Sequence, residues 1–159
     1  MRIGVGYDIH RLVEGRAFPL GGVLLDHSHG PEGYSDGDAL AHALIDALLG
    51  AAALGDIGGH FPPGDPRWRG ASSIDLLAGT RDLVSQAGYR VHNVDATVIL
   101  EAPRIGPYVQ SVRASLAAAL QLPIDRVSVK AKTNEGLDAV GNKDAIAVHA
   151  VALLEEVSP

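Results

Sequence analysis

Residues 35–62, SDGDALAHALIDALLGAAALGDIGGHFP, decide how this chain folds. The middle of the stretch is rich in alanine and leucine, which predicts a helix over residues 38–54. The few polar residues of this helix, Asp38, His42 and Asp46, are four apart and therefore share one face. Because the other faces are apolar, we expect the helix to be buried. Unpaired buried charge is costly, so we expect the three polar residues to have a functional role.

The remaining segments predict a mixture of strands and helices. Alternating apolar residues predict strands or a hairpin at residues 2–11, 18–25, 91–100 and 126–132. Helical spacing predicts further helices at residues 73–87 and from Pro107 to residue 120. Loops are expected at residues 26–34, 58–70 and 133–142. Residues 145–154 are apolar on both faces, and their propensity favours a helix. We expect one α/β (α+β) domain over residues 1–159 with a mixed sheet.

Composition limits the classes of function. The 159 residues include 13 Lys and Arg against 19 Asp and Glu, a formal charge of −6, and no basic run that would bind nucleic acid. The absence of cysteine excludes disulfides, thiolate metal sites and cysteine nucleophiles. Neither a secretory signal nor a run of 18 uncharged apolar residues is present, so we expect a soluble cytoplasmic protein without a membrane partner.

Asp8, His10 and His42 form a candidate metal site. Asp8 and His10 are two apart on a predicted strand and point to the same side of it, where Gly4 and Gly6 are expected to leave the face open. The predicted helix supplies His42 as a third ligand. One carboxylate and two imidazoles with an open fourth position are typical of catalytic zinc.

A plainer interpretation of these residues stays open. In it, Asp8 caps a loop and each histidine is an ordinary hydrogen-bonded side chain. The polar helix face favours the metal site, because Asp38 and Asp46 are candidates to support His42 without binding the metal themselves. Asp46 lies one turn away from His42 and is expected to orient its ring.

Two further motifs each allow two interpretations. The turn Gly55–Asp56–Ile57–Gly58 is either a helix stop or a set of backbone donors and a carboxylate for a polyol or phosphate. Residues 130–136, KAKTNEG, are either a solvated strand end or a site for phosphate and a divalent ion. In the second case Glu135 would hold Mg²⁺, which prefers carboxylate oxygens.

Taken together and in order, these stretches resemble one family along essentially the whole chain: 2-C-methyl-D-erythritol 2,4-cyclodiphosphate synthase. The resemblance rests on five segments: RIGVGYDIHR (2–11), the stretch at 35–62, DATVILEAPRI (95–105), VKAKTNEGLDAVG (129–141) and AIAVHAVALL (145–154). It implies a homotrimer with active sites between adjacent subunits. It also implies a mixed four-stranded sheet with helices on one face, and a strand rather than a helix at 145–154.

The activity that the resemblance implies is a phosphorus–oxygen lyase reaction of non-mevalonate isoprenoid biosynthesis. The substrate, 4-diphosphocytidyl-2-C-methyl-D-erythritol 2-phosphate, is cyclised and CMP is released. The cofactors implied are one Zn²⁺ per site on Asp8, His10 and His42, and Mg²⁺ or Mn²⁺ at Glu135 with the substrate diphosphate. Tyr34 and Thr133 are the implied catalytic residues.

The resemblance also implies a substrate site with three parts: a polyol pocket around residues 56–58, a cytosine pocket along residues 100–106, and a diphosphate path along residues 132–135. The substrate-binding residues it implies are Asp8, His10, Tyr34, Ser35, Asp56, Ile57, Gly58, Phe61, Asp65, Leu100, Ala102, Pro103, Arg104, Ile105, Gly106, Lys132, Thr133, Asn134, Glu135, Ala139 and Asn142.

The chain departs from the family pattern at four positions. Tyr34 stands where the family often has His, and Pro63 stands where Asp is frequent, which removes one polyol contact. Asn142 replaces a common Arg near the trimer axis and weakens the case for an anionic prenyl diphosphate in the central cavity, which Ala139 would widen. Two alternatives stay open: a zinc-dependent phosphohydrolase on the same scaffold, and a catalytically silent trimeric zinc-binding protein.

Overall fold

One mixed sheet organises the molecule. The computed structural model describes residues 1–157. The strands of the sheet are β1 (Arg2–Glu14), β4 (His29–Pro31), β5 (Tyr89–Ile99), β6 (Val127–Lys132) and β7 (Ala145–Glu156). Over residues 1–157 they form a five-stranded sheet in the order β4-β1-β7-β5-β6, in which β5 and β6 are parallel and the other neighbours are antiparallel. The expected mixed sheet is therefore confirmed, with five strands instead of four.

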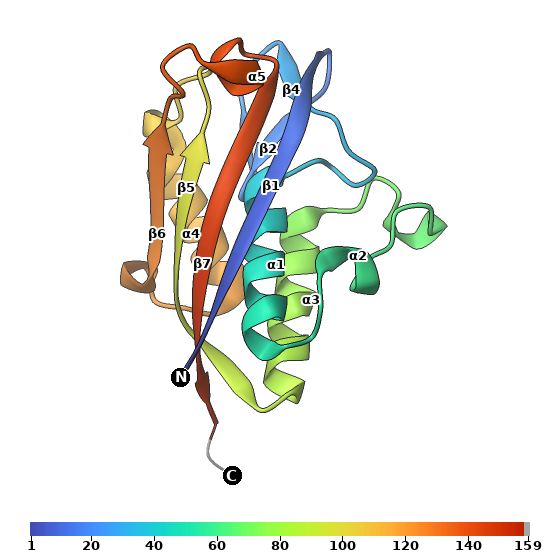
Figure 1. The fold of residues 1–159 in the computed structure, drawn as a ribbon, viewed down its shortest axis with the longest axis vertical. Helices are drawn as coiled ribbons and strands as arrows, with labels where there is room; N and C mark the ends of the chain where they lie inside the picture. The colour runs from blue at the N-terminus through green and yellow to red at the C-terminus, as the bar shows by residue number, and fades with distance from the viewer. Residues whose placement is uncertain (158–159) are drawn as a thin grey trace.

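A separate hairpin and a layer of helices complete the fold. The hairpin pairs β2 (Phe18–Leu20) with β3 (Val23–Leu25), as the sequence predicts. The helices are α1 (Ala39–Ala52), α2 (Ile57–His60), α3 (Ser73–Gln86), α4 (Val109–Leu120) and α5 (Asp138–Gly141), with short 3-10 turns η1 (Pro66–Trp68), η2 (Gly106–Tyr108) and η3 (Ile124–Arg126). The three long helices, α1, α3 and α4, lie together behind the sheet in Figure 1, so one sheet face is covered and the other is left open.

Four local expectations were wrong, each for a physical reason. Residues 26–34, 58–70 and 133–142 contain the short elements β4, α2, η1 and α5, because three or four residues carry too little periodicity to be recognised. The helical propensity of residues 145–154 was misleading, since this segment is strand β7, as the resemblance implied. It lies between β1 and β5 and pairs with both along its length, and this tertiary context overrides propensity.

Helix α1 begins at a carboxylate cap that also holds the hairpin. The Asp38 side chain accepts hydrogen bonds from the backbone N–H groups of Ala41 (3.0 Å), Gly21 (2.9 Å) and Gly22 (2.8 Å). Burial raises the pKa of Asp38, and these three N–H groups offset part of that rise. Asp38 therefore joins the β2–β3 turn to the start of α1.

The open face of the sheet is unusually apolar. Ile3, Val5, Tyr7 and Ile9 of β1 point away from the helices and are exposed by 70%, 68%, 49% and 47%.

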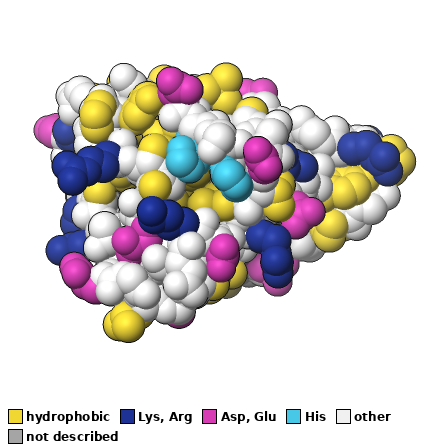
Figure 2. Space-filling model, turned by 90° about the horizontal axis from the view of Figure 1, so that it is seen from above, with side chains coloured by type: hydrophobic (Ala, Val, Ile, Leu, Met, Phe, Trp, Pro, Cys, Tyr) yellow, Lys and Arg dark blue, Asp and Glu magenta, His cyan; other side chains and the backbone are white. Residues whose placement is uncertain are grey.

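At the end of the molecule seen in Figure 2, basic and acidic side chains are interspersed around histidines, with no continuous basic patch. Within residues 1–157, no helix is long and apolar enough to span a membrane.

Candidate active site around a metal-binding triad

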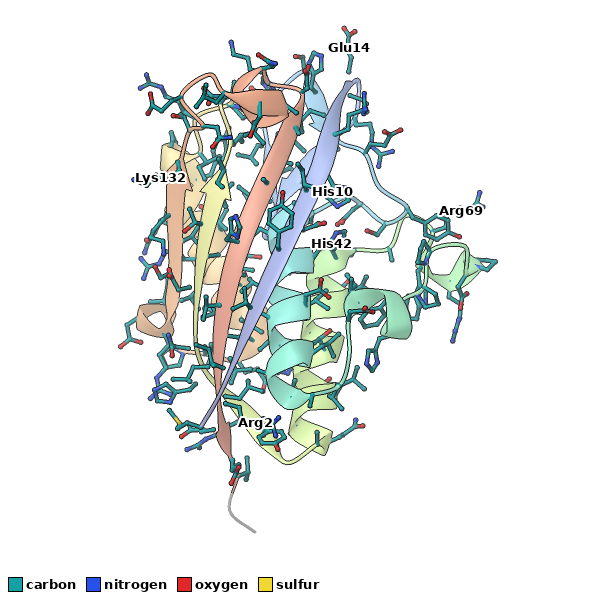
Figure 3. All side chains as sticks on the ribbon, viewed as in Figure 1. Arg2, His10, Glu14, His42, Arg69 and Lys132 are labelled. Atoms are coloured by element: carbon teal, nitrogen blue, oxygen red, sulfur yellow. The ribbon has the colours of Figure 1, made fainter. Side chains whose placement is uncertain are left out.

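Asp8, His10 and His42 converge on one point between β1 and α1. His10 Nε2 lies 2.8 Å from Asp8 Oδ2, and His42 Nδ1 lies 3.1 Å from the same oxygen and 3.1 Å from His10 Nε2. All three side chains are largely buried, with 12–23% of their surface exposed. Figure 3 shows His10 on β1 and His42 at the top of α1 close to one another. The structure thus brings together the three residues that the sequence predicted as metal ligands.

Two glycines allow this convergence. A Cβ atom at Gly6 would lie 1.8 Å from the carbonyl oxygen of Ala43, and one at Gly4 would lie 2.0 Å from that of Ala47. The backbone of β1 therefore packs directly against the backbone of α1. The expectation that these glycines leave the face open was wrong, because the helix itself fills the space they provide.

The surroundings of Asp8 favour its ionised form. Burial alone would raise the pKa of Asp8, but hydrogen bonds and charges from His10 and His42 outweigh it and lower that pKa. Burial would lower the pKa of His10, whereas Asp8 raises it, and the net shift is upward. The lowered pKa of Asp8 favours the ionised carboxylate, which is the form that binds a metal.

The outer nitrogens of the two histidines have hydrogen-bond partners that the sequence analysis did not identify. His10 Nδ1 lies 2.5 Å from the carbonyl oxygen of Glu32, and His42 Nε2 lies 2.8 Å from Ser73 Oγ and 3.1 Å from Ser35 Oγ. Carbonyl acceptors leave no sequence signature, and Ser73 is 31 positions from His42. Such pairs can be found only from the fold.

Asp38 and Asp46 have other partners. Asp46 Oδ1 accepts a hydrogen bond from the backbone N–H of Ile57 at 2.8 Å and so fixes the start of α2. Burial raises the pKa of Asp46. Within residues 1–157 neither Asp38 nor Asp46 is hydrogen-bonded to the His42 ring, so the expectation that they support it was wrong. The outer edge of that ring faces the start of α3 instead.

A cavity of about 260 Å³ opens beside the triad. Its lining includes eight residues predicted for the site: Asp8, His10, Tyr34, Ser35, His42, Ile57, Gly58 and Phe61. It also includes four that were not predicted to bind: Asp46, Pro63, Trp68 and Leu76. A larger cavity of about 440 Å³ lies elsewhere, against Arg81, Arg90 and Glu155. We assign the site to the smaller cavity because the three ligand atoms converge on it.

Two predicted substrate-binding residues, Asp56 and Asp65, lie outside the lining of this cavity. Asp56 caps α2, its Oδ1 accepting a hydrogen bond from Gly59 N at 2.9 Å. Asp65 pairs with Arg67 at 2.6 Å, and hydrogen bonds from Arg67 lower the pKa of Asp65. The carbonyl oxygen of Asp65 also accepts a hydrogen bond from the Tyr34 hydroxyl at 3.1 Å.

The other predicted residues gather where β5 and β6 end. Glu101 Oε1 accepts hydrogen bonds from Asn134 N (2.7 Å) and Gly136 N (3.5 Å), and so joins the loop at 100–106 to the loop at 132–136. Sequence reasoning missed this role of Glu101. The side chains of Leu100 and Ile105 are buried in the core and offer a ligand only backbone groups, whereas Lys132, Thr133 and Glu135 are exposed.

Ala139 and Asn142 lie at α5, beside the loop at residues 132–136, where Asp138 Oδ2 accepts a hydrogen bond from Asn134 Nδ2 at 2.8 Å. Ala139 lines a hollow of about 390 Å³ on the open sheet face together with Tyr7 and His149. Asn142 ends the helix, its backbone N–H donating to Asp138 O at 3.0 Å.

The two groups do not meet within one chain. β1 and β6 are separated by β7 and β5, which amounts to three interstrand spacings or about 14 Å. Figure 3 shows Lys132 across the sheet from His10 and His42. The triad cavity and the 132–135 loop are therefore two separate surfaces of the chain.

Comparison with known proteins identifies the family. A family model described as the YgbB family matches residues 1–155. The chain belongs to the YgbB family. It is 59% identical to the 2-C-methyl-D-erythritol 2,4-cyclodiphosphate synthase of Gloeobacter violaceus, over 98% of this chain and 96% of that protein.

Solved structures of YgbB-like proteins share the fold. A structure of 2C-methyl-D-erythritol-2,4-cyclodiphosphate synthase in a CDP-bound form superimposes with a TM-score of 0.90 at 43% identity, covering 97% of this chain and 100% of that one. The bifunctional IspDF from Campylobacter jejuni matches with a TM-score of 0.95 at 37% identity. The match covers 99% of this chain but only 42% of that protein.

Proposed function

We propose that the chain converts 4-diphosphocytidyl-2-C-methyl-D-erythritol 2-phosphate into 2-C-methyl-D-erythritol 2,4-cyclodiphosphate and CMP, in non-mevalonate isoprenoid biosynthesis. The observation that carries this proposal is the convergence of Asp8, His10 and His42 on a cavity in a YgbB-family chain. The curated relatives that bear this enzyme's name support the reaction, and the CDP-bound neighbour supports a cytidine diphosphate-type substrate.

The triad fits zinc. Its ligand atoms lie 2.8–3.1 Å apart, close to the separation of about 3.3 Å between ligands of a tetrahedral zinc ion. Asp8, His10 and His42 would hold the ion beside the cavity. When bound, it supplies charge neutralisation and polarisation at a phosphate oxygen. We assign Mg²⁺ or Mn²⁺ with the substrate diphosphate to Glu135, whose carboxylate is exposed.

The reaction requires alignment more than covalent chemistry. An oxygen of the 2-phosphate attacks the β-phosphorus of the diphosphate, the bond from that phosphorus to the oxygen bridging to CMP breaks, and CMP leaves with that oxygen. The Ser35 hydroxyl at the cavity orients the phosphate, and the turn at residues 56–58 holds the polyol. The Tyr34 hydroxyl donates a hydrogen bond to the carbonyl oxygen of Asp65, so we assign the role of Tyr34 to its backbone N–H. Thr133 donates a hydrogen bond to the diphosphate in the transition state.

We further propose that the two surfaces meet across a subunit boundary in a homotrimer. The apolar open face of β1 supports this assembly, because a face carrying Ile3, Val5, Tyr7 and Ile9 is costly to leave in water. The separation of about 14 Å between β1 and β6 also supports it. An adjacent subunit would supply Glu135 to the triad of its neighbour.

Phosphorus-31 NMR of the product tests the function. We expect one cyclic diphosphate and one CMP for each substrate consumed. A linear 2,4-bisphosphate with CMP would instead indicate a phosphohydrolase that uses water as nucleophile. Stoichiometric zinc without any CMP release would indicate a catalytically silent binding protein.

A further inference from the structure

A chain of side-chain contacts runs outward from His42. His42 Nε2 lies 2.8 Å from Ser73 Oγ, and Ser73 Oγ donates to Asp36 Oδ1 at 2.5 Å. The second oxygen of Asp36 accepts a hydrogen bond from the backbone N–H of Ser73 at 3.0 Å. Ser73 is completely buried. We propose that Ser73, held by Asp36, is a positioning residue that sets the tautomer and orientation of His42 for metal binding. This proposal rests on the metal site of the proposed function.

The direction of the hydrogen bonds follows from the triad. His42 Nδ1 faces Asp8 and His10, so it must be unprotonated to bind a metal. The ring proton then resides on Nε2, which must donate to Ser73 Oγ. The Ser73 hydroxyl consequently donates to a further acceptor, which is Asp36 Oδ1. A hydroxyl that donated to Nε2 would place the proton on Nδ1 and block the ligand position.

Ser35 does not perform this task equally well. Its Oγ lies 3.1 Å from His42 Nε2 and 3.2 Å from Ser73 Oγ, but it has no carboxylate partner within residues 1–157 that would fix the direction of its proton. Asp36, in contrast, is itself fixed: its backbone N–H donates to Ala71 O at 3.1 Å. The loop before α1 and the start of α3 are thereby joined at the edge of the site.

His10 is supported in a parallel way. Its Nδ1 lies 2.5 Å from the carbonyl oxygen of Glu32, an acceptor that can only receive a proton. The Glu32 carbonyl at His10 and the Ser73 hydroxyl at His42 therefore have the same effect. Each keeps the ring proton on the outer nitrogen and leaves the inner nitrogen free to bind a metal. Only the second support can be removed by substituting a side chain.

Cobalt binding tests the proposal without reference to catalysis. Full-length protein is stripped of metal and titrated with Co²⁺, following the visible absorption of the bound ion. We expect Ser73→Ala to raise the Co²⁺ dissociation constant about 10- to 100-fold, since outer partners of metal-bound histidines have effects of that size. Ser73→Thr, which keeps the hydroxyl, should recover much of the affinity. Asp36→Asn should weaken binding as Ser73→Ala does. The amide can donate to Ser73 Oγ, and the Ser73 hydroxyl would then donate to His42 Nε2 instead of accepting from it.

Thr80 provides the matched control. It is also completely buried on α3, but within residues 1–157 its hydroxyl donates only to Leu76 O, at 2.9 Å. Thr80→Val therefore removes a buried hydroxyl from the same helix without touching His42, and should bind Co²⁺ as the unmodified protein does. Unchanged affinity in folded Ser73→Ala, or an equal loss in Thr80→Val, would overturn the positioning role. Failure of the unmodified protein to bind Co²⁺ would overturn the metal site beneath it.

Discussion

The triad and the loop at the end of β6 differ in how completely one chain builds them. Asp8, His10 and His42 are largely buried, within hydrogen-bond distance of one another, and supported by further contacts. Thr133 and Glu135 are exposed, and the hydrogen bond between them is long, at 3.4 Å. The first surface is preorganised within the chain, whereas the second leaves its side chains exposed. This difference favours an active site completed by a second subunit.

Removing a triad ligand should have the largest effect on catalysis. We expect His42→Ala to lose bound zinc and to lower CMP release by roughly 10³-fold or more, because no neighbour replaces the imidazole. Alanine suits the helix, so the fold should survive. Metal analysis, CMP assay and circular dichroism together check this. Normal turnover with zinc still bound would show that the triad is not the metal site.

The close contact between β1 and α1 should be the next most sensitive feature. Gly6→Ala places a Cβ atom 1.8 Å from the Ala43 carbonyl oxygen, so strand and helix must separate. We expect a loss of about 3 kcal/mol in the free energy of unfolding, together with weaker metal binding. Urea denaturation and metal titration measure the two effects.

Gly50 is the control for this substitution. It lies on α1 and is exposed, and a Cβ atom added there would meet no other atom within 4 Å in the described part of the chain. Gly50→Ala should stabilise the protein by about 0.5–1 kcal/mol. Equal stability changes for the two variants would contradict the packing role of Gly6.

Substitution of Glu135, in the loop that follows β6, should have a milder effect, on the Mg²⁺ requirement instead of on zinc binding. Glu135→Gln should retain zinc but raise the Mg²⁺ concentration for half-maximal CMP release by about tenfold, since one charged oxygen ligand is lost. Glu14→Gln, an exposed glutamate at the end of β1, should leave the titration unchanged. An identical Mg²⁺ titration for Glu135→Gln and the unmodified protein would remove Glu135 from the metal assignment.

Much of the preorganised region could be predicted because its signals are local. Alternation along β1 places Asp8 and His10 on one side, and the four-residue spacing in α1 places His42 on the polar face of the helix. Helix capping by Asp38 follows from its position before the alanine-rich run. The family resemblance joins the two segments, which local patterns alone leave apart.

The parts that could not be predicted depend on distant pairs. Gly4 and Gly6 act by contact with α1, some 40 positions later, which no local pattern encodes. Asp36 and Ser73 meet because α3 starts beside the loop before α1. β7 is a strand because β1 and β5 flank it, although its composition favours a helix.

Mixed trimers test most directly whether the two surfaces form one site. Chains carrying His42→Ala are combined with chains carrying Glu135→Gln, and mass spectrometry confirms mixed assembly. If each site takes His42 from one subunit and Glu135 from the next, random mixing at equal amounts restores about one quarter of the sites. At a limiting Mg²⁺ concentration, where Glu135→Gln chains alone retain about a tenth of the unmodified rate, we therefore expect about one quarter of the unmodified rate, above either parent. Activity no greater than the average of the parents, in confirmed mixed trimers, would contradict a shared site.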